Sequence, residues 1–295
     1  IMKELFNLGK LYVSDFINNN ENPRGNRVEM KLLLEESTGA VRLEKSAPLD
    51  TMYGKYWYRS GINSIMTNEL KGIVKSITGL IKLKENDIWV DIACNDGTMF
   101  KFMPQNIIKI GIDPVDDTYK EQSEKVSDLI IQDYFSYDVF KRSKFGKAKA
   151  KVITSIAMFY DLENPIKFLK DVYSLLDDNG LWVLQLSYTP LMIKQMAFDN
   201  FVHEHIYYYS LFNLKKLFED NGFKYLTGLI EPDKNDMNCR GGLLNTAKKK
   251  QVIAAAEGIV DAIVKGDDSF LRDMEQLINE YPRHELAPLP EGNPL

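Results

Sequence analysis

Two of the three histidines of this 295-residue chain lie in one segment, His203-Glu204-His205. An imidazole with an ordinary pKa near 6.5 accepts a proton at neutral pH, and a neighbouring carboxylate can orient it. Imidazole and carboxylate also ligate Zn²⁺, but no further Cys or His lies close by to complete such a site. The segment therefore predicts a general base rather than a metal centre. The alternative, that one histidine packs beneath the tyrosines that follow, applies best to His203.

A second candidate site is a turn of small residues. Asp91 lies in the apolar run Ile88 to Ile92, which leads into the turn Ala93 to Gly97. Such a turn lets backbone N–H groups and a helix expected to begin at Thr98 approach a ligand closely. The pattern G-x-G-x-x-G is absent, which disfavours a nicotinamide or flavin. The alternative is an ordinary turn from strand to helix.

Acidic residues close the next two apolar runs, and both suit a nucleoside. Asp113 follows Ile107 to Ile112, at the offset where a carboxylate accepts hydrogen bonds from ribose hydroxyls. Asp133 follows Leu129 to Gln132, and Tyr134 beside it offers an aromatic face to an adenine ring. The alternative for Tyr134 is a place in the hydrophobic core.

The apolar runs alternate with helical segments, which is typical of a parallel α/β sheet. A fourth run, Val152 to Ala157, precedes a helix at Ile166 to Leu176, and a fifth run follows at Leu181 to Leu186. In such sheets ligands bind at the carboxyl ends of the strands, where Ser155 also falls. The sequence therefore predicts a Rossmann-like sheet with a cofactor site along one edge.

The ends of the chain give weaker patterns. Leu5 to Phe16 and Val28 to Leu34 are expected to form strands of a small N-terminal module. Ile253 to Ile263 and Ser269 to Tyr281 are expected to form two short helices before a proline-rich tail. The predicted organisation is an N-terminal module at 1–60, a main domain at 61–250 and a helical extension at 251–295.

Length and composition agree with a soluble enzyme. Hydrophobic residues make up 44% of the chain, enough for a sizeable core. The net charge of −5 gives no general attraction to nucleic acid or to an anionic membrane. The sequence holds no apolar run long enough for a membrane span and no leading signal segment, so we expect a cytoplasmic protein. Because the sequence starts at Ile1, we expect the native chain to begin earlier.

Together these features resemble the class I S-adenosylmethionine-dependent methyltransferases, over about residues 70 to 250. The resemblance implies a seven-stranded sheet that ends in an antiparallel hairpin, with Phe223 to Ile230 and Gly241 to Ala247 as its strands. It also implies S-adenosylmethionine as the cofactor. The implied cofactor contacts are Asp91, Ala93, Asn95 and Gly97 on the methionine side, Asp113 at the ribose, Asp133 and Tyr134 at the adenine, and Ser155.

Three segments resemble the sugar-nucleotide C-methyltransferases in particular: YRSGIN at 58–63, DIACNDGT at 91–98 and FDNFVHEHIYYYSL at 198–211. In that family the last histidine of an H-E-H segment removes a proton next to a ketone, and the resulting enolate carbon attacks the methyl group of the cofactor. The resemblance gives this role to His205, with Glu204 polarising it and Tyr160 assisting proton transfer or orientation. The implied substrate contacts are Tyr58, Arg59, Ser60, His203, Asn235, Asn238 and Arg240. The alternative for the asparagines is that they only shape a turn.

The chain departs from that family in three places. The family's N-terminal module binds zinc through two cysteine pairs, and here Glu35 and Thr38 stand at the second pair, so a structural zinc is not supported by these residues, although a first pair could precede Ile1. Val202 replaces a tyrosine before H-E-H, and the segment with Tyr160 replaces a histidine. No second α/β domain is recognisable after residue 250, which favours a smaller ligand or a partner subunit.

The predicted function is therefore C-methylation of a keto-deoxysugar nucleotide, a reaction of deoxysugar biosynthesis. One alternative is an O-methyltransferase in which the same histidine deprotonates a hydroxyl of a sugar or another small molecule. Another is a non-catalytic cofactor-binding subunit, which would account for the missing zinc ligands and the missing domain. The sequence leaves the acceptor and the oligomeric state open.

Overall fold

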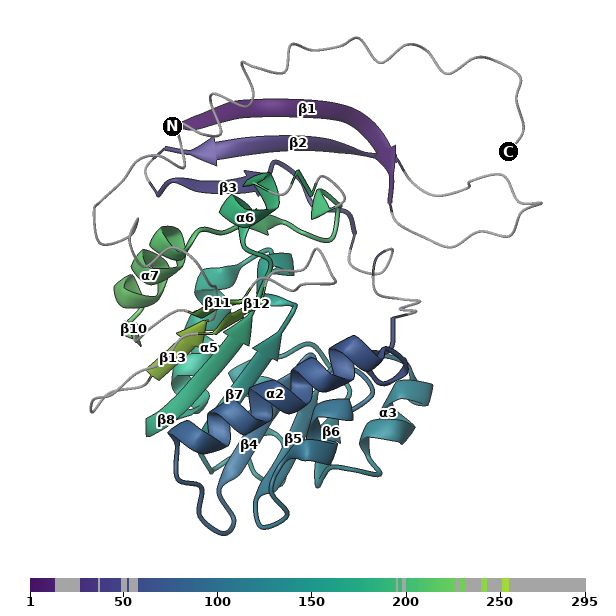
Figure 1. Cartoon of the computed structure of the whole chain (residues 1–295), viewed down its shortest axis with the longest axis vertical. Helices are drawn as coiled ribbons and strands as arrows, with labels where there is room; N and C mark the ends of the chain where they lie inside the picture. Colours follow the sequence, from purple (N-terminus) through teal and green to yellow (C-terminus); the bar gives the residue numbers. More distant parts are fainter. Residues whose placement is uncertain are drawn as a thin grey trace, which may run out of the picture.

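The computed structural model describes residues 1–13, 27–36, 38–48, 52, 58–194, 196–197, 200–225, 229–231, 240–242 and 251–254. Two sheets dominate it, a seven-stranded sheet in the lower half of Figure 1 and a four-stranded sheet above. The predicted contacts Asn235 and Asn238, and nearly all of the predicted C-terminal helices, lie outside the described residues.

The seven-stranded sheet confirms the predicted Rossmann-like class. Its order is β10-β13-β8-β7-β4-β5-β6, and every neighbouring pair runs parallel. Its interior strand β4 is buried along its whole length, as expected for a strand covered on both faces. The strands are β4 (Ile88–Ile92), β5 (Ile108–Ile112), β6 (Leu129–Ile131), β7 (Ala150–Ile156), β8 (Leu176–Gln185), β10 (Lys224–Tyr225) and β13 (Gln251–Ala254).

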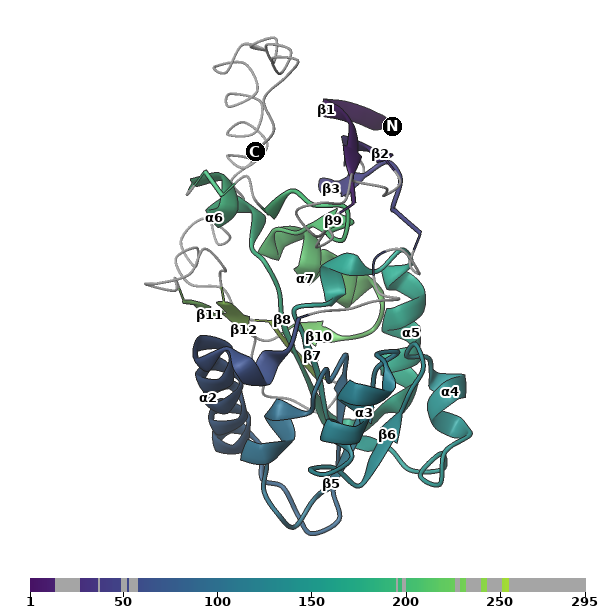
Figure 2. The same ribbon diagram turned by 90° about the vertical axis from the view of Figure 1, so that its right-hand side faces the viewer.

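Helices cover both faces of this sheet. Figure 2 shows α2 on one side and α3, α4 and α5 on the other. The helix α2 begins where the Asn63 side chain accepts hydrogen bonds from the next turn, and it buries Leu70, Val74 and Ile77. The helices are α2 (Ser64–Leu80), α3 (Asp117–Ser123), α4 (Tyr137–Lys141), α5 (Pro165–Leu175), α6 (Thr189–Lys194) and α7 (Leu211–Asp220). Among these described helices, none is long and apolar enough to cross a membrane.

The strand order sets the position of a ligand site. The chain builds β4, β5 and β6 in one direction and then returns to place β7 on the other side of β4. In open α/β sheets, ligands bind outside the carboxyl ends of the strands where the order reverses. The carboxyl ends of β4, β5 and β7 are therefore the expected location.

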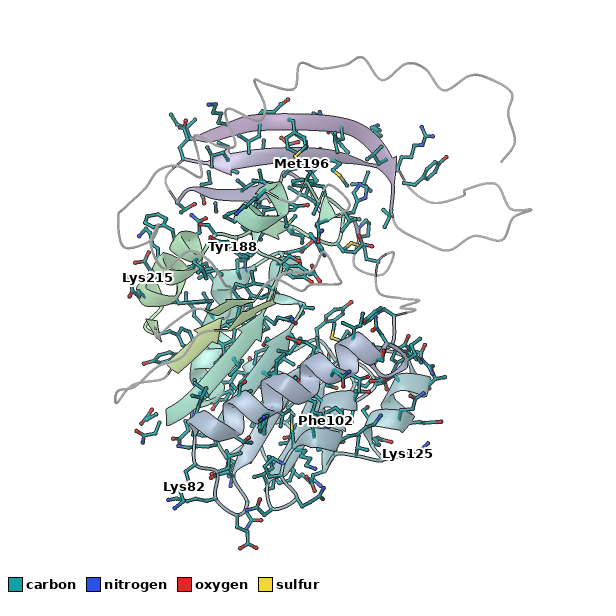
Figure 3. All side chains as sticks on the ribbon, viewed as in Figure 1. Lys82, Phe102, Lys125, Tyr188, Met196 and Lys215 are labelled. Carbon is teal, nitrogen blue, oxygen red and sulfur yellow. The ribbon has the colours of Figure 1, made fainter. Side chains whose placement is uncertain are left out.

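The smaller sheet combines three N-terminal strands with a short strand from much later in the chain. Its antiparallel order is β1-β2-β3-β9, with β1 (Met2–Tyr12), β2 (Arg27–Glu35), β3 (Ala40–Leu43) and β9 (Tyr207–Tyr208). One face packs on an apolar cluster that includes Leu32, Leu43, Met192 and Tyr208. The N-terminal strands are thus completed by a strand that follows the H-E-H segment. Tyr188, buried and labelled in Figure 3, lies between the two sheets.

The structure differs from prediction at the sheet edge and at the first turn. An antiparallel pair exists, but among the described strands β11 (Leu229–Glu231) and β12 (Arg240–Gly242) pair only with each other, apart from the large sheet. Beyond β8 the sheet instead continues with β13, which runs parallel to β8, and ends with β10 at the edge. The helix predicted to begin at Ile253 is therefore wrong at its start. Adjacent β-branched residues, Val252 and Ile253, favour a strand there. The helix expected at Thr98 is a short 3-10 turn, Thr98–Phe102.

Gly111 of β5 gives a test of the packing beneath the first turn. A Cβ at this position would lie 2.5 Å from Cys94 Sγ and 2.6 Å from Ile130 Cδ1. We expect Gly111→Ala to lower the free energy of unfolding by about 1–3 kcal/mol in urea denaturation. The double variant with Cys94→Ala should recover part of this loss.

The matched control is Gly72→Ala in α2, where a Cβ would meet nothing within 4 Å. Alanine favours a helix, so this variant should gain up to about 1 kcal/mol. Equal stabilities of the two alanine variants would contradict the close approach at Gly111.

Candidate active site

A cavity of about 300 Å³ lies at the carboxyl ends of β4, β5 and β7, where the strand order places a ligand. Four segments that follow strands contribute to it. The residues that line the cavity include Tyr58, Ser60, Met66, Asp91, Ala93, Asn95, Asp113, Tyr134, Met158, Asp161 and Glu163.

The turn after β4 has an unusual backbone. Ala93, Asn95 and Gly97 all have positive φ, at 62°, 52° and 72°. For residues other than glycine this conformation costs on the order of 1 kcal/mol each. Hydrogen bonds hold it in place: the Ala93 N–H donates to the Ile112 carbonyl at 2.9 Å, and the Asn95 N–H donates to Asp113 Oδ2 at 2.7 Å. Strain of this kind persists where the surroundings fix the backbone, and here it shapes the cavity wall.

Gly97 has a different place from the one we expected. It does not line the cavity; a Cβ there would lie 2.7 Å from the Cα of Ser123 in α3. Its lack of a side chain therefore allows the turn to approach α3 closely. Ala93 and Asn95 do line the cavity, and their contact with the methionine side of the cofactor stays a prediction.

The segment before α2 is bonded to this turn. The Asn95 side chain accepts from the Ser60 N–H at 3.0 Å and donates to the Tyr58 carbonyl at 3.0 Å. Asp96 Oδ2 accepts from the Gly61 N–H at 2.9 Å. A Cβ at Gly61 would lie 2.7 Å from the same Oδ2, so the close approach requires glycine. These bonds make the segment one wall of the cavity.

Of the three substrate contacts implied for this segment, two line the cavity. Tyr58 and Ser60 line the cavity, whereas Arg59 points to α3. Arg59 Nη2 donates to Thr118 Oγ1 at 2.9 Å, and the guanidinium carbon lies 4.6 Å from the ring centroid of Tyr119. Arg59 therefore fixes the segment to its neighbour instead of facing the cavity.

Two buried carboxylates form part of the lining. Asp91 Oδ1 accepts from the Thr154 hydroxyl at 2.6 Å, and Asp113 accepts from the backbone N–H groups of Asn95 and Val115. Burial raises the pKa of Asp91 to about 7, against the effect of the Thr154 bond. Burial also raises the pKa of Asp113 to about 6, and its two N–H donors limit the rise.

The lining is largely apolar, and its formally charged side chains are all acidic. Asp161 and Glu163, which follow β7, join Asp91 and Asp113, while no Lys, Arg or His of the described residues lines the cavity. A cavity with carboxylates and low-dielectric walls attracts a cation more strongly than the same carboxylates do in water. This site therefore suits a ligand with positive charge.

His205 and Tyr160 are not among the residues that line the cavity, and one contact links them to it. His205 contacts Tyr160, with ring centroids 4.4 Å apart, and the adjacent Asp161 is a lining residue. His205 Nδ1 lies 2.9 Å from the Asn200 carbonyl, and a carbonyl can only accept, so Nδ1 carries the hydrogen and Nε2 carries the lone pair. Burial lowers the pKa of His205 to about 4, although the Asn200 bond raises it. The imidazole is therefore neutral at pH 7.

The other two residues of the H-E-H segment differ from expectation. The group that orients His205 at Nδ1 is the Asn200 carbonyl, whereas we expected the Glu204 carboxylate to hold this ring. His203 does not line the cavity; it is 1% exposed, and its Nε2 bonds to the Val28 carbonyl at 3.0 Å. The alternative that one histidine serves packing thus describes His203.

Of the two predicted adenine contacts, one lines the cavity and the other does not. Tyr134 lines the cavity and is 46% exposed, so its alternative place in the core is wrong. Asp133 is exposed beside it, 3.9 Å from Arg142, and is not a lining residue. Ser155 is fully buried and its hydroxyl accepts from Trp182 Nε1 at 3.1 Å, which is a structural contact. Of Arg240, only the backbone is described, in β12.

Sequence reasoning missed several residues of the site. Met158, Asp161 and Glu163 line the cavity directly after β7, and the rule that ligands bind at carboxyl ends would have found them. The role of Asp96, which holds Gly61 in place, leaves no such signal because it depends on a contact with a distant segment.

Metal ligands are not grouped in the part of the chain that the structure describes, which holds no cluster of three or more His, Cys, Asp or Glu side chains suited to a metal. At the turn after β2, the Thr38 hydroxyl donates to the Glu35 carboxylate at 2.6 Å. A hydroxyl and a carboxylate bonded to each other do not fit a thiolate zinc site.

The residues present do fit S-adenosylmethionine, whose sulfonium and ammonium groups match an acidic cavity and whose adenosine matches Asp113 and Tyr134. Fold and site together define a class I S-adenosylmethionine-dependent methyltransferase domain. Residues 63–227, more than half of the chain, match the family described as "Methyltransferase domain", and the chain belongs to this family.

One curated protein is similar in sequence. C-methyltransferase NovU of Streptomyces niveus is 23% identical over 176 residues, which cover 59% of this chain and 42% of that protein. The chain thus spans less than half the length of this relative.

Solved structures of methyltransferases are also similar. A putative methyltransferase in complex with the Haloferax volcanii activator Trm112 has a TM-score of 0.48 and 15% identity, over 60% of this chain and 78% of that one. A methyltransferase of Leishmania major has a TM-score of 0.48 and 13% identity, over 63% of this chain and 75% of that one.

Asp91→Asn tests the charge in the cavity. Because the pKa of Asp91 is raised on folding, the folded protein retains a proton that the unfolded chain releases between about pH 4 and 7, so this group makes the parent less stable as the pH rises. We expect the neutral variant to be more stable than the parent at pH 8 by on the order of 2 kcal/mol in urea unfolding, with the difference closing toward pH 4. Its affinity for S-adenosylmethionine should fall about tenfold or more.

The control is Asp128→Asn, whose carboxylate bonds the Lys109 N–H outside the cavity. This variant should keep the parent's cofactor affinity. Unchanged cofactor affinity in Asp91→Asn would mean that its charge does not act on the ligand.

Proposed function

We propose that this protein C-methylates a keto-deoxysugar nucleotide, using His205 as the general base. The observation that carries the proposal is the state of His205. Its ring is neutral, its Nδ1–H is held by the Asn200 carbonyl, and its Nε2 lone pair is the one available for a proton. A half-buried imidazole fixed in this tautomer is prepared to act as a base.

The proposed reaction begins with proton removal. His205 Nε2 takes the proton from the carbon next to the ketone, and the electron pair of that C–H bond becomes the enolate. Bound S-adenosylmethionine supplies an electrophilic methyl group, so the enolate carbon forms a C–C bond as the S–CH₃ bond breaks. The imidazolium left on His205 is unfavourable in a half-buried place by itself, and the negative charge of the enolate beside it offsets this cost. Tyr160, in edge contact with the ring, is the proposed orienting group.

The similarity to C-methyltransferase NovU supports transfer to carbon. The acidic lining supports a cavity for the cationic cofactor, and it does not suit a diphosphate. A nucleotide diphosphate would therefore bind beyond this lining. Arg240, with Asn235 and Asn238, is the proposed contact for it.

A second candidate is O-methylation, and the low pKa of His205 favours it. A weak base removes a proton from a hydroxyl more readily than from a carbon atom. The same Nε2 would then accept a hydroxyl proton, and the hydroxyl oxygen would receive the methyl group.

Carbon NMR of the product separates the two reactions. With S-adenosylmethionine labelled at the methyl carbon and a panel of keto-sugar nucleotides, we expect a C-methyl signal; a methoxy signal would establish O-methylation instead. His205→Gln should lose at least about 100-fold in kcat because the base is removed, with cofactor affinity by calorimetry unchanged.

The matched control is His284→Gln, which changes the one histidine outside the H-E-H segment and should retain activity. An active His205→Gln variant would remove this histidine from the chemistry. No turnover by the parent with any acceptor would leave a cofactor-binding subunit as the function.

The pH dependence should separate cofactor binding from chemistry. As the pH falls from 8 to 5, Asp91 and Asp113, with pKa values near 7 and 6, take up protons in the free enzyme, so the KM for S-adenosylmethionine should rise about tenfold or more. At saturating cofactor, kcat should hold until the pH approaches the His205 pKa of about 4. Initial rates over a grid of pH and cofactor concentration measure both. A kcat that halves near pH 6.5 would contradict the lowered pKa of His205.

A further inference from the structure

We propose that His203 is a positioning residue, which holds the loop carrying His205 against strand β2 and so makes the N-terminal sheet part of the catalytic apparatus. This inference rests on the proposed role of His205 as the base. It assigns to the first histidine of the segment a task different from substrate binding.

The contact of His203 with β2 is specific. Its side chain is 1% exposed, and its Nε2 lies 3.0 Å from the carbonyl oxygen of Val28, near the start of β2. Because a carbonyl only accepts, Nε2 carries the hydrogen and the ring is held in one tautomer. A buried hydrogen bond between residues 175 positions apart in sequence fixes the loop to the sheet.

The chain is also fixed immediately after His205. The Ile206 carbonyl accepts from the Leu43 N–H of β3 at 2.8 Å, and the Ile206 N–H donates to the Tyr160 carbonyl at 3.0 Å. One bond leads to the N-terminal sheet and the other to the segment after β7. His205 therefore lies between two attachments, His203 on one side and Ile206 on the other.

Aromatic packing supports the same arrangement. Phe201 lies in edge contact with Phe6 of β1, with centroids 5.7 Å apart, and its ring centroid lies 5.0 Å from that of Tyr208 in β9. This packing resists pulling the loop away from the sheet, but it does not fix the direction of a ring two or more residues later. The directional hydrogen bond of His203 can do so, because it constrains the backbone next to His205.

Position matters for the base because its orienting contact is local. His205 Nδ1 bonds to the Asn200 carbonyl, in the same loop. A loop that moves on the sheet moves both groups relative to Tyr160 and to the cavity. Misplacement of a catalytic group by about 1 Å can cost on the order of 100-fold in rate.

The experiment compares His203→Leu, which removes the donor, with His203→Gln, whose amide N–H can still donate to Val28. Histidine NMR with ¹⁵N label is practical because the chain has three histidines, and His205→Gln assigns the signal of interest. In His203→Leu we expect the pKa of His205 to rise from about 4 by at least about one unit toward 6.5, because the loosened loop admits water. With an acceptor, kcat should fall about tenfold or more while the KM for cofactor is kept. His203→Gln should restore both.

The control is Leu34→Ala, which loosens the same apolar cluster without removing a hydrogen bond to the loop, and should leave the His205 pKa unchanged. Equal pKa values in the parent and His203→Leu, or an equal shift in Leu34→Ala, would overturn the proposal. So would an Nδ1–H tautomer of His203 in the parent protein, a result that needs no variant to fold. Because NMR reads the ring directly, this test stands even if no acceptor is turned over.

Discussion

The backbone of Ile206 joins the two sheets of this protein, and the arrangement of the candidate active site depends on that junction. Its carbonyl bonds to β3 and its N–H to the residue before Asp161, so one peptide segment is held between the N-terminal sheet and the cofactor cavity. The strand β9 follows directly, pairing with β3. The N-terminal sheet is therefore completed and oriented by the segment that carries the base.

The cavity itself is held by a different kind of constraint. In the turn after β4, every second residue from Ala93 to Gly97 has a positive φ, which is unfavourable for Ala93 and Asn95. The turn persists because the Asn95 N–H donates to the Asp113 carboxylate and the Asn95 side chain accepts from the Ser60 N–H. The same side chains join the turn to the segment before α2. The shape of the cavity therefore depends on this backbone. A change at the Asn95 carboxamide or the Asp113 carboxylate is expected to move the cavity wall that the turn forms.

Much of this could be predicted from the sequence, because short apolar runs with polar residues at their ends are a local signal. The strands β4 to β8 and the lining residues Asp91, Asp113 and Tyr134 follow from that rule. The rule wrongly placed Ser155 in the cavity, because a position at a strand end does not determine on which face of the sheet a side chain lies. The Ser155 hydroxyl instead bonds to Trp182 in the core. The pairing of β9 with β3 and the bond of His205 to the Asn200 carbonyl were not predictable, because both contacts use backbone groups, which every residue type carries.

The acidic lining has a consequence for the end of the reaction cycle. Transfer of the methyl group converts the sulfonium of S-adenosylmethionine into the neutral thioether of S-adenosylhomocysteine. The ionised carboxyl groups of the lining are expected to attract the first ligand through that charge and to lose this attraction for the second. We therefore expect the charge of the lining to favour fresh over spent cofactor, so that the chemistry itself weakens the binding of its by-product.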